Sequence, residues 1–421
     1  MSGNGTRGTI LVIGGGISGL TAAVEAAEAG CDVVLVERQA FLGGRVARSH
    51  QYFPKLCPPQ CGLEITLRRI RGNPHIRCLT LAEVRGIRGS PGRYQVTIAR
   101  RPRRVTEACT ACGACVDACP VERPDDFNLG LRTTKAIYLP YPMAYPFQFV
   151  IDDRVCPGAS CAKCVPACPF DAIDLAMTPA TLDVEAQAVV ITTGWDPYDA
   201  TRLTELGFGT VPNVVTNVML ERLAAPAGPT AGRLVRPSDG APLRSVAFVQ
   251  CAGSRDEHHL RHCSGVCCLG SLKQARYVRA QYPDADVYVF YIDIRAPGRL
   301  EDFFAATKAD GRVHLVKGKV AAVVADPDSG GVTVEAEDVL AGERRRQTVD
   351  LVVLATGIVA ADTSGIDVAG GLQRDPHGFL TRAQAQPGIV AAGCATRPAD
   401  VATCVRDATG AVLKALAFCP E

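Results

Sequence analysis

The sequence predicts an α/β protein made of two Rossmann-like units, with a small cysteine-rich insert in the first. Three observations support this fold class. A strand, a glycine-rich turn, a helix and a second strand follow one another over residues 9–37, and the same order returns from about residue 240. Between these units, residues 103–178 hold two short cysteine runs with metal-type spacing.

The first unit is predicted from a change in hydrophobic pattern. Residues 9–13 form a continuous run rich in β-branched residues, which is typical of a buried strand. The alanine-rich stretch 22–29 predicts a helix that ends at Gly30, and residues 33–36 predict the second strand. Strand, helix and strand in this order favour a parallel sheet.

The turn after the first strand has the G-x-G-x-x-G spacing, with Gly14, Gly16 and Gly19. The first glycine allows a tight turn, the second lets the backbone approach a pyrophosphate, and the third lets helix and strand pack closely. The pyrophosphate would lie at the helix N-terminus, where free N–H groups favour an anion. Glu37 closes the second strand, where a carboxylate is expected to accept from a ribose hydroxyl. An ordinary glycine-rich turn is the alternative, but the complete context favours a dinucleotide.

The following segment favours FAD over NAD. Gly43, Gly44 and Arg45 resemble the stretch beside the flavin in two-dinucleotide-domain flavoproteins of the thioredoxin-reductase-like fold. Fragments of that family return as A-T-G at 355–357 and G-I-V-A-A-G-C at 388–394, where Cys394 stands at a position that is commonly Asp. The usual carboxylate contact to the ribityl chain is therefore in question. The predicted cofactor-binding residues are Gly14, Gly16, Ile17, Ser18, Gly19, Glu37, Arg38, Gly43, Gly44, Arg45, Thr193, Gly194, Gly393, Cys394, Asp400 and Val401.

The two cysteine runs predict two [4Fe–4S] clusters. The first has the C-x2-C-x2-C-x3-C-P spacing of bacterial ferredoxins, in which three thiolates bind one cubane and the fourth binds its neighbour. The second run has four residues after its first cysteine but keeps C-x2-C-x3-C-P. A zinc site or disulfides are the alternative, which two tandem copies disfavour. The predicted ligand sets are Cys109, Cys112 and Cys115 with Cys168, and Cys156, Cys161 and Cys164 with Cys119.

Two further loops are rich in cysteine and in turn residues, unlike cysteines that pack as small hydrophobes. A third iron–sulfur cluster, a redox-active thiol pair near the flavin and a structural role all stay open for them. For a cluster, the predicted ligands are Cys263, Cys267 and Cys268 with one of Cys57 and Cys61. Chemistry is otherwise assigned to the cofactors, and the candidate reactive thiols are Cys57, Cys61, Cys251 and Cys394. Single cysteines interpreted as packing or surface residues are Cys31, Cys78, Cys404 and Cys419.

The second unit opens at R-S-V-A-F-V-Q-C-A-G-S-R-D and continues through a predicted helix at 271–281. Its turn keeps only Gly253, so NAD(P)H binding is not expected there. The predicted domains are residues 1–102, the first segment of the FAD-binding domain; 103–178, a 2[4Fe–4S] ferredoxin-like insert; 179–239, FAD-domain continuation and linker; 240–355, the second Rossmann-like domain; and 356–421, the last segment of the FAD-binding domain.

Two segments flank the cysteine runs. The basic run at 100–104 is interpreted as a solvated linker. The proline- and aromatic-rich segment Y-L-P-Y-P-M-A-Y-P-F at 138–147 is expected to wrap the insert against the flavin domain or a partner, and to exclude water from the clusters.

Composition limits partners and location. With 421 residues and a net charge of +2, nothing points to nucleic acid or an anionic membrane surface. Nineteen cysteines in mostly metal-type spacings favour a reducing cytosol over a disulfide-bonded secreted domain. The start, M-S-G-N-G-T-R-G, lacks the features of a signal peptide, and no apolar run approaches the roughly 18 residues needed to cross a bilayer. We expect a cytoplasmic protein that reaches a membrane only through partners.

Several motifs together resemble the flavin-binding A subunit of heterodisulfide reductases over nearly the whole chain: G-G-G-I-S-G-L-T-A-A-V-E-A, F-V-Q-C-A-G-S-R-D-E, C-S-G-V-C-C and V-Y-V-F-Y-I-D-I-R-A. Within that group, K-L-C-P-P-Q-C-G-L-E-I-T-L-R-R-I and T-N-V-M-L-E-R-L-A-A-P-A-G-P-T are similar to the QmoA family, the A subunit of the quinone-interacting membrane-bound oxidoreductase. The resemblance implies an FAD protein in a complex peripherally attached to the inner membrane. Its implied partners are adenylylsulfate (APS) reductase, a QmoB-like flavin/iron–sulfur protein and a QmoC-like haem membrane protein.

The resemblance implies that such a complex passes electrons between the quinone pool and APS reductase in dissimilatory sulfur metabolism. The alternative is the A subunit of a soluble heterodisulfide-reductase-type complex, which would perform flavin-based electron bifurcation or disulfide or polysulfide reduction. A catalytic dithiol predicts that alkylation abolishes turnover while the clusters stay intact. No C-x-x-C outside the ferredoxin-type runs supports that interpretation.

Overall fold

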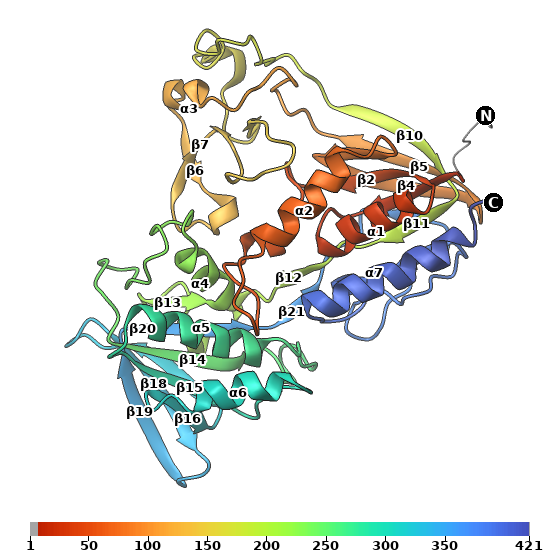
Figure 1. The fold of residues 1–421 in the computed structure, drawn as a ribbon. Helices are drawn as coiled ribbons and strands as arrows, with labels where there is room; N and C mark the ends of the chain where they lie inside the picture. Colours follow the sequence, from red (N-terminus) through yellow and green to blue (C-terminus); the bar gives the residue numbers. More distant parts are fainter. Residues whose placement is uncertain (1–6, 421) are drawn as a thin grey trace.

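The computed structural model describes residues 7–420. Residues 1–6, which are part of the N-terminal stretch in which no signal peptide is predicted, lie outside the described residues. Two α/β domains and a mostly loop-built insert make up the fold (Figure 1). The predicted α/β class with two Rossmann-like domains is confirmed. Within residues 7–420 no helix is long and apolar enough to span a bilayer.

The first domain is built on a five-stranded parallel sheet with the order β23-β11-β1-β2-β3. Its strands are β1 (Thr9–Ile13), β2 (Asp32–Glu37), β3 (Ile76–Thr80), β11 (Ala188–Ile191) and β23 (Ile389–Ala391). One face is covered by the helices α1 (Ile17–Glu28), α2 (Gln60–Arg71) and α7 (Val401–Leu416). The other is covered by a sheet of β4 (Ala82–Ser90), β5 (Arg93–Arg100), β10 (Ala180–Ala186) and β22 (Asp367–Val368).

Alternation along β1 explains these layers. Ile10 and Val12 pack with the helices, whereas Leu11 and Ile13 pack with the antiparallel strands. All four are buried, because successive strand side chains point to opposite faces and both faces are covered. The continuous apolar run in the sequence is therefore the signature of a central strand.

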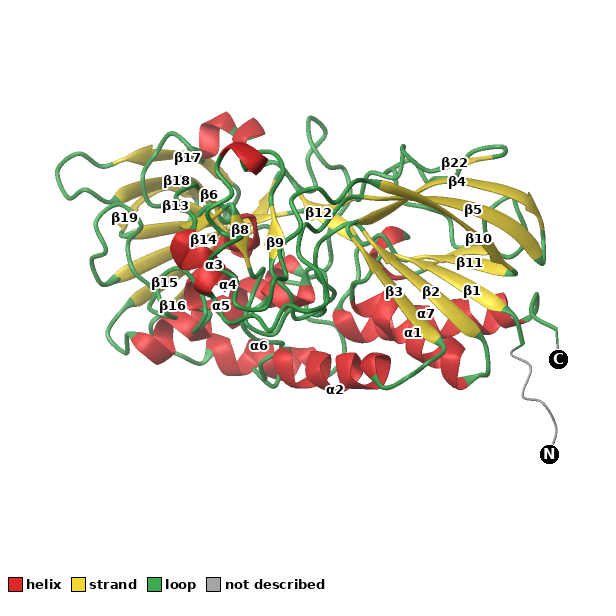
Figure 2. Ribbon diagram, turned by 90° about the horizontal axis from the view of Figure 1, so that it is seen from above, coloured by secondary structure: helices red, strands yellow, loops and turns green. Residues whose placement is uncertain are grey.

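The second domain repeats this plan. Its five-stranded parallel sheet has the order β13-β20-β14-β15-β16, from β13 (Val214–Thr216), β14 (Ser245–Ala252), β15 (Asp286–Tyr291), β16 (Val313–Lys317) and β20 (Leu351–Thr356). Its helices are α4 (Asn217–Ala224), α5 (Cys267–Gln281) and α6 (Leu300–Lys308). The opposite face carries the antiparallel strands β17 (Val320–Ala325), β18 (Val332–Asp338) and β19 (Glu343–Val349). Figure 2 shows helices on one side of both domains and antiparallel strands on the other.

The domains are joined by a two-stranded antiparallel ribbon, β12 (Trp195–Pro197) with β21 (Ile358–Ala360). Short 3-10 turns follow at Ala200–Arg202 and Thr204–Leu206. Strand β13 and helix α4 lie in the stretch expected as FAD-domain continuation and linker, yet they belong to the second domain. Strand β13 has only three residues, too few to show a periodic pattern.

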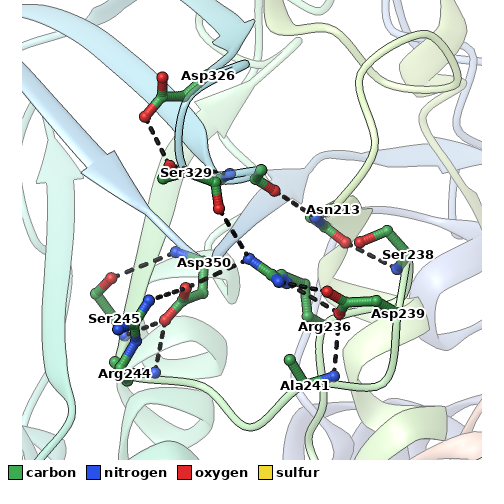
Figure 3. Close-up of polar contacts among 12 residues, drawn as sticks. Asn213, Arg236, Ser238, Asp239, Ala241, Arg244, Ser245, Asp326, Ser329 and Asp350 are labelled. Carbon is green, nitrogen blue, oxygen red and sulfur yellow. Dashed lines mark hydrogen bonds and ion pairs between the residues drawn. The ribbon is translucent and has the colours of Figure 1, made fainter.

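A polar cluster closes one end of the second sheet (Figure 3). Asp350, just before β20, accepts hydrogen bonds from the backbone N–H of Arg244 (2.7 Å) and Ser245 (3.1 Å) at the start of β14. Arg236 lies 3.8 Å from the Asp350 carboxylate and also pairs with Asp239. The cluster fixes the amino ends of parallel strands, so the carboxyl ends are left for ligands.

The insert lies between the paired strands β5 and β10. It contains α3 (Ala114–Ala118), the hairpin strands β6 (Glu122–Pro124) and β7 (Thr133–Lys135), and the pair β8 (Ile137–Tyr138) and β9 (Val150–Ile151). The aromatic segment fixes it to the first domain, as expected: Tyr141 stacks on Phe127 at 4.9 Å and its hydroxyl donates to the Leu42 carbonyl at 3.2 Å.

Candidate functional site

The β1–α1 turn is too tight for any side chain at two of its glycines. Gly14 has φ +105°, and a Cβ there would lie 2.4 Å from the Thr192 carbonyl oxygen. A Cβ on Gly19 would lie 1.8 Å from the Gly14 oxygen. These contacts account for the first and third glycines of the motif by backbone packing.

The second glycine pair packs on the first. The Gly43 N–H donates to the Gly15 carbonyl (2.8 Å), and a Cβ on Gly44 would lie 2.8 Å from the Gly16 Cα. Helix α1 begins here without a side-chain cap. Its free N–H groups therefore suit a pyrophosphate, as the sequence predicted.

These turns open into a cavity of about 610 Å³. Its lining comes from residues between 14 and 48, 81 and 154, 192 and 196, and 394 and 404. The predicted residues that line it are Gly14, Gly16, Ile17, Ser18, Glu37, Arg38, Gly44, Arg45, Thr193, Gly194, Cys394 and Val401. Gly19, Gly43 and Gly393 are not in its lining, and Asp400 lines an adjoining cavity.

Glu37 lies at the carboxyl end of β2 with 7% of its surface exposed. One carboxylate oxygen accepts from the Gly15 N–H (2.6 Å) and the other from the Gln39 N–H (2.7 Å). Burial raises the pKa of this carboxyl above its ordinary value, against the opposing effect of these hydrogen bonds. A carboxylate offers about four acceptor positions, so acceptor capacity remains for a ribose hydroxyl.

The sequence interpretation missed Arg48, which lines the same cavity from the 3-10 turn Val46–Arg48. Its guanidinium lies 5.4 Å from the centre of the Phe127 ring. Burial, together with the nearby Arg45 and Arg222, lowers its pKa to about 10. The R-x-x-R spacing of 45 and 48 was the available signal, and both cations suit an anionic cofactor.

Arg45 connects the cavity to the interdomain ribbon. Its Nε donates to the Trp195 carbonyl at 3.2 Å, and its guanidinium pairs with Asp196. Arg45 was predicted from the glycine pair alone. The structure shows that its position depends on β12 as well.

The eight cysteines of the two runs converge in two separate small cavities. One cavity, which we call the distal nest, is lined by Cys109, Cys112, Cys115 and Cys168. The other, which we call the proximal nest, is lined by Cys119, Cys156, Cys161 and Cys164. Each nest takes three thiols from one run and one from the other, which is the pairing the sequence predicted. Left-handed turns at Ala111 (φ +57°) and Ala162 (φ +45°) bend the chain within the runs.

The nests have the polarity expected of cluster sites. Backbone N–H groups approach the sulfurs of Cys109, Cys156 and Cys168 at 3.4 Å each. Burial and neighbouring thiols raise the pKa of Cys115 to about 11, so a positively charged centre would favour its thiolate. Hydrogen bonds to sulfur and burial are the features by which proteins tune cluster potentials.

One residue is common to the flavin cavity and the proximal nest. Ile151, in β9, lines both. Its backbone N–H donates to the Arg103 carbonyl at 3.2 Å, which holds the strand against the first domain. The two cavities therefore adjoin at Ile151.

The basic run 100–104 is not a solvated linker throughout. Arg103 is 5% exposed and donates to the Ala40 carbonyl (2.5 Å) and the Thr80 hydroxyl (2.9 Å). Arg104 pairs with Asp153 of the insert. The expectation was wrong because loop carbonyls buried between insert and domain need donors.

The remaining loop cysteines separate into two groups. Cys251, at the end of β14 with φ +58°, interacts electrostatically with Cys263 and Cys268, and Cys267 interacts with all three. Cys57 and Cys61 are exposed, on a loop whose residues Phe53 and Leu56 pack against Leu269 and Leu272 of α5. Near Cys251, the Gln250 amide and Ser254 hydroxyl are buried without a hydrogen-bond partner among the described residues. Orphaned polar groups of this kind suggest that something further belongs beside them.

Comparison with known proteins agrees with this geometry. The FAD dependent oxidoreductase family matches residues 9–56, and the 4Fe-4S binding domain family matches residues 102–122. The Lactococcus lactis thioredoxin reductase structure is similar in fold, with a TM-score of 0.54 at 12% identity over 98% of both chains. This likeness confirms the thioredoxin-reductase-like arrangement of the two domains.

Curated relatives extend the match to almost the whole chain. It is 38% identical over 420 residues to the A subunit of the ferredoxin:CoB-CoM heterodisulfide reductase of Methanosarcina mazei, covering 97% of this chain and 52% of that protein. It is 37% identical over 426 residues to an iron-sulfur A subunit of the CoB--CoM heterodisulfide reductase of Methanopyrus kandleri, covering 97% and 63%. The chain thus spans about half to under two thirds of these relatives' length. It holds the FAD and iron–sulfur domains of an oxidoreductase, and its homologues are the A-subunit flavoproteins of heterodisulfide reductases.

Proposed function

We propose that the chain is an electron-transfer subunit that connects a two-electron cofactor to one-electron carriers. FAD supplies the exchange between electron pairs and single electrons, and the protein supplies binding, orientation and tuning. The observation that carries this proposal is the wall shared by the flavin cavity and the proximal nest at Ile151. No side-chain acid or base is needed for transfer across it.

The cavity is suited to a flavin that gains negative charge. Arg48 lines it as a largely buried cation, whereas the charge of Arg45 is offset by its ion pair with Asp196, which lines the same cavity. Val401 begins α7 at the same cavity, and the N-terminus of this helix favours an anion nearby. Asp400 caps this helix, and its carboxylate accepts a hydrogen bond from the Thr403 N–H at 2.7 Å. That N–H partly offsets the negative charge of Asp400 beside the cavity.

The positions of the two nests give an order for electron transfer. The proximal nest shares a wall with the flavin cavity, and the distal nest holds Cys112, which is exposed. Electrons would pass from flavin to proximal cluster to distal cluster, or the reverse, and meet a partner near Cys112.

Rapid reduction of the flavin in anaerobic protein tests this order. The Cys164→Ser variant removes a proximal ligand, and we expect at least a tenfold slower reduction of the distal cluster by the flavin. The matched Cys112→Ser variant removes a distal ligand and should leave reduction of the proximal cluster at the wild-type rate. Stopped-flow absorbance and electron paramagnetic resonance follow the two clusters. Equal distal rates in wild type and Cys164→Ser would refute the order.

We further propose a third cluster bound by Cys251, Cys263, Cys267 and Cys268. The electrostatic interactions among their thiols and the orphaned polar groups beside Cys251 support this set. It retains three ligands expected from the sequence and replaces Cys57 or Cys61 by Cys251. Iron analysis of the Cys251 and Cys57 variants decides between the sets.

For the complex, we propose a QmoA-like role. Here the chain would pass electrons between the quinone pool and APS reductase, through QmoB-like and QmoC-like partners at the inner membrane. The motifs around Cys57–Cys61 and in 216–230 support it. The second candidate, a soluble heterodisulfide-reductase-type complex, is favoured by the names of relatives such as those of Methanosarcina mazei and Methanopyrus kandleri, which are A subunits of CoB-CoM heterodisulfide reductases.

Isolation of the native complex under anaerobic conditions distinguishes the two candidates. A QmoA-like role predicts that a haem-bearing membrane protein co-purifies, and that quinol reduces the FAD and the clusters. Co-purification of only haem-free subunits, without reduction by quinol, would instead establish the soluble alternative.

A further inference from the structure

Two thiols that the sequence treats as unrelated meet in the wall of the flavin cavity. Cys394 follows β23 in the 3-10 turn Gly393–Ala395, and Cys404 lies in the first turns of α7. Their sulfur atoms are 3.5 Å apart. Both residues line the cavity that also contains Gly14 and Gly16.

The pair is held from several sides. Cys394 is 7% exposed and Cys404 4% exposed. The Cys394 thiol also lies 3.3 Å from the Ala399 carbonyl, and the Ser18 hydroxyl donates to the Cys404 carbonyl at 3.4 Å. Because Ser18 belongs to α1, the pair is fixed relative to the dinucleotide turn.

The two thiols differ in acidity. The contact between the two sulfurs lowers the pKa of Cys404 and, together with burial, raises the pKa of Cys394. Cys404 is also close to the N-terminus of α7, which favours a thiolate.

A second thiol pair in the same domain serves as a comparison. Cys31 and Cys419 are buried and their thiols influence one another's pKa, but neither lines the flavin cavity. Burial raises the pKa of Cys31 and raises that of Cys419 to about 12. Proximity of sulfurs is common to both pairs, whereas access to the flavin cavity and an acidic member distinguish Cys394 and Cys404.

We propose that Cys394 and Cys404 are a redox-active dithiol that exchanges an electron pair with the bound FAD. In the oxidising direction the two S–H bonds break and one S–S bond forms. The two electrons and two protons released reduce the oxidised isoalloxazine to its dihydro form. The reverse step returns them, so the pair stores two electrons beside the flavin.

This inference rests on FAD binding, which is measured separately by flavin absorbance. Trypsin leaves both cysteines in one peptide, 383–406, because Arg397 is followed by Pro398. A disulfide within it lowers the peptide mass by two hydrogens and blocks alkylation. The state of the pair can therefore be determined in the intact wild-type protein, without any variant.

The test begins with FAD-loaded protein oxidised by diamide and desalted under anaerobic conditions. We expect peptide 383–406 in its disulfide form. One equivalent of dithionite per FAD, followed by acid quench and alkylation, should yield two alkylated thiols. Protein stripped of FAD and treated identically should keep the disulfide. Thiols that persist after diamide, or equal reduction with and without FAD, would overturn the proposal.

Reductive titration gives an independent measure. The Cys404→Ser variant should take up two electrons fewer per chain than wild type at equal flavin and iron content. The matched Cys419→Ser variant alters the other pair and should take up the wild-type number. Equal uptake by wild type and Cys404→Ser would also overturn the proposal, whatever the partners of the chain.

Discussion

The two Rossmann-like domains present different chemistry at the same topological position. In the first, β1 is followed by a short glycine turn and the uncapped start of α1. In the second, β14 is followed by a longer loop, and α5 begins with Cys267. Of the G-x-G-x-x-G glycines only Gly253 is retained there, where a Cβ would lie 2.6 Å from the Tyr198 ring. At the position where the first domain has free backbone N–H groups, the second domain has thiols.

The difference shows what the scaffold fixes and what it leaves free. Both sites lie at the carboxyl ends of central parallel strands, where α/β sheets bind ligands. Both sheets are covered by helices on one face and antiparallel strands on the other (Figure 2). Backbone approach suits a pyrophosphate and thiolates suit iron, so the turn residues determine the ligand while the architecture stays the same.

The largest expected effect is from Gly19→Ala in the first turn. Its Cβ would lie 1.8 Å from the Gly14 oxygen, so the turn must open and the pyrophosphate site is lost. We expect no retained FAD and a loss of stability of about 3 kcal/mol. Flavin absorbance and thermal unfolding measure both. Purification of this variant with stoichiometric FAD would show that the close packing is not required.

The cysteine-rich turn after β14 in the second domain is tested by the Cys251→Ser variant. If its thiols bind a cubane, the variant should lose about four irons per chain while keeping FAD. The matched Cys57→Ser variant should keep all its iron, because Cys57 is exposed and outside the group. Iron analysis and flavin absorbance are sufficient. Loss of iron from Cys57→Ser but not from Cys251→Ser would restore the ligand set expected from sequence.

A smaller effect is expected at Glu37, through pH. Burial raises its folded-state pKa, so between about pH 4.3 and that raised value the empty folded protein binds more protons than the unfolded chain and loses stability as pH rises. A ribose hydroxyl that donates to the carboxylate favours the ionised form. FAD affinity should therefore rise with pH across this window.

The Glu37→Gln variant should lose this pH dependence and bind FAD about tenfold more weakly at neutral pH. Fluorescence titration of apoprotein at several pH values measures both. Parallel pH profiles in the two proteins would remove Glu37 from the cofactor site.

The smallest effect is expected from Gly270→Ala in α5. Apart from its chain neighbours and the nearby helix backbone, no heavy atom lies within 4 Å of the added Cβ, and the helix gains an alanine in place of glycine. We expect a stability gain of about 0.5–1 kcal/mol with unchanged FAD and iron. Chemical denaturation measures it. A loss of iron would show that the start of α5 is more closely packed around its thiols than the structure indicates.

The features predictable from sequence are those encoded by local spacing. The turn of 14–19 and the exchange of Cys119 and Cys168 between the nests follow from motifs that act over a few residues. Burial of Arg103 does not, because its acceptors come from residues 40 and 80 of another region of the chain. The pairing of Cys394 with Cys404 depends on the loop that returns the chain into α7, so single cysteines in the sequence gave no signal.

The ribbon between the domains has a mechanical consequence. Asp196 in β12 pairs with Arg45 at the flavin cavity, and β12 is held to β21 by backbone pairing. Any rotation of the second domain about this ribbon would pull on that guanidinium and alter the field at the cofactor. Docking of another protein far from the cavity could thereby change the midpoint potential of the flavin without touching it.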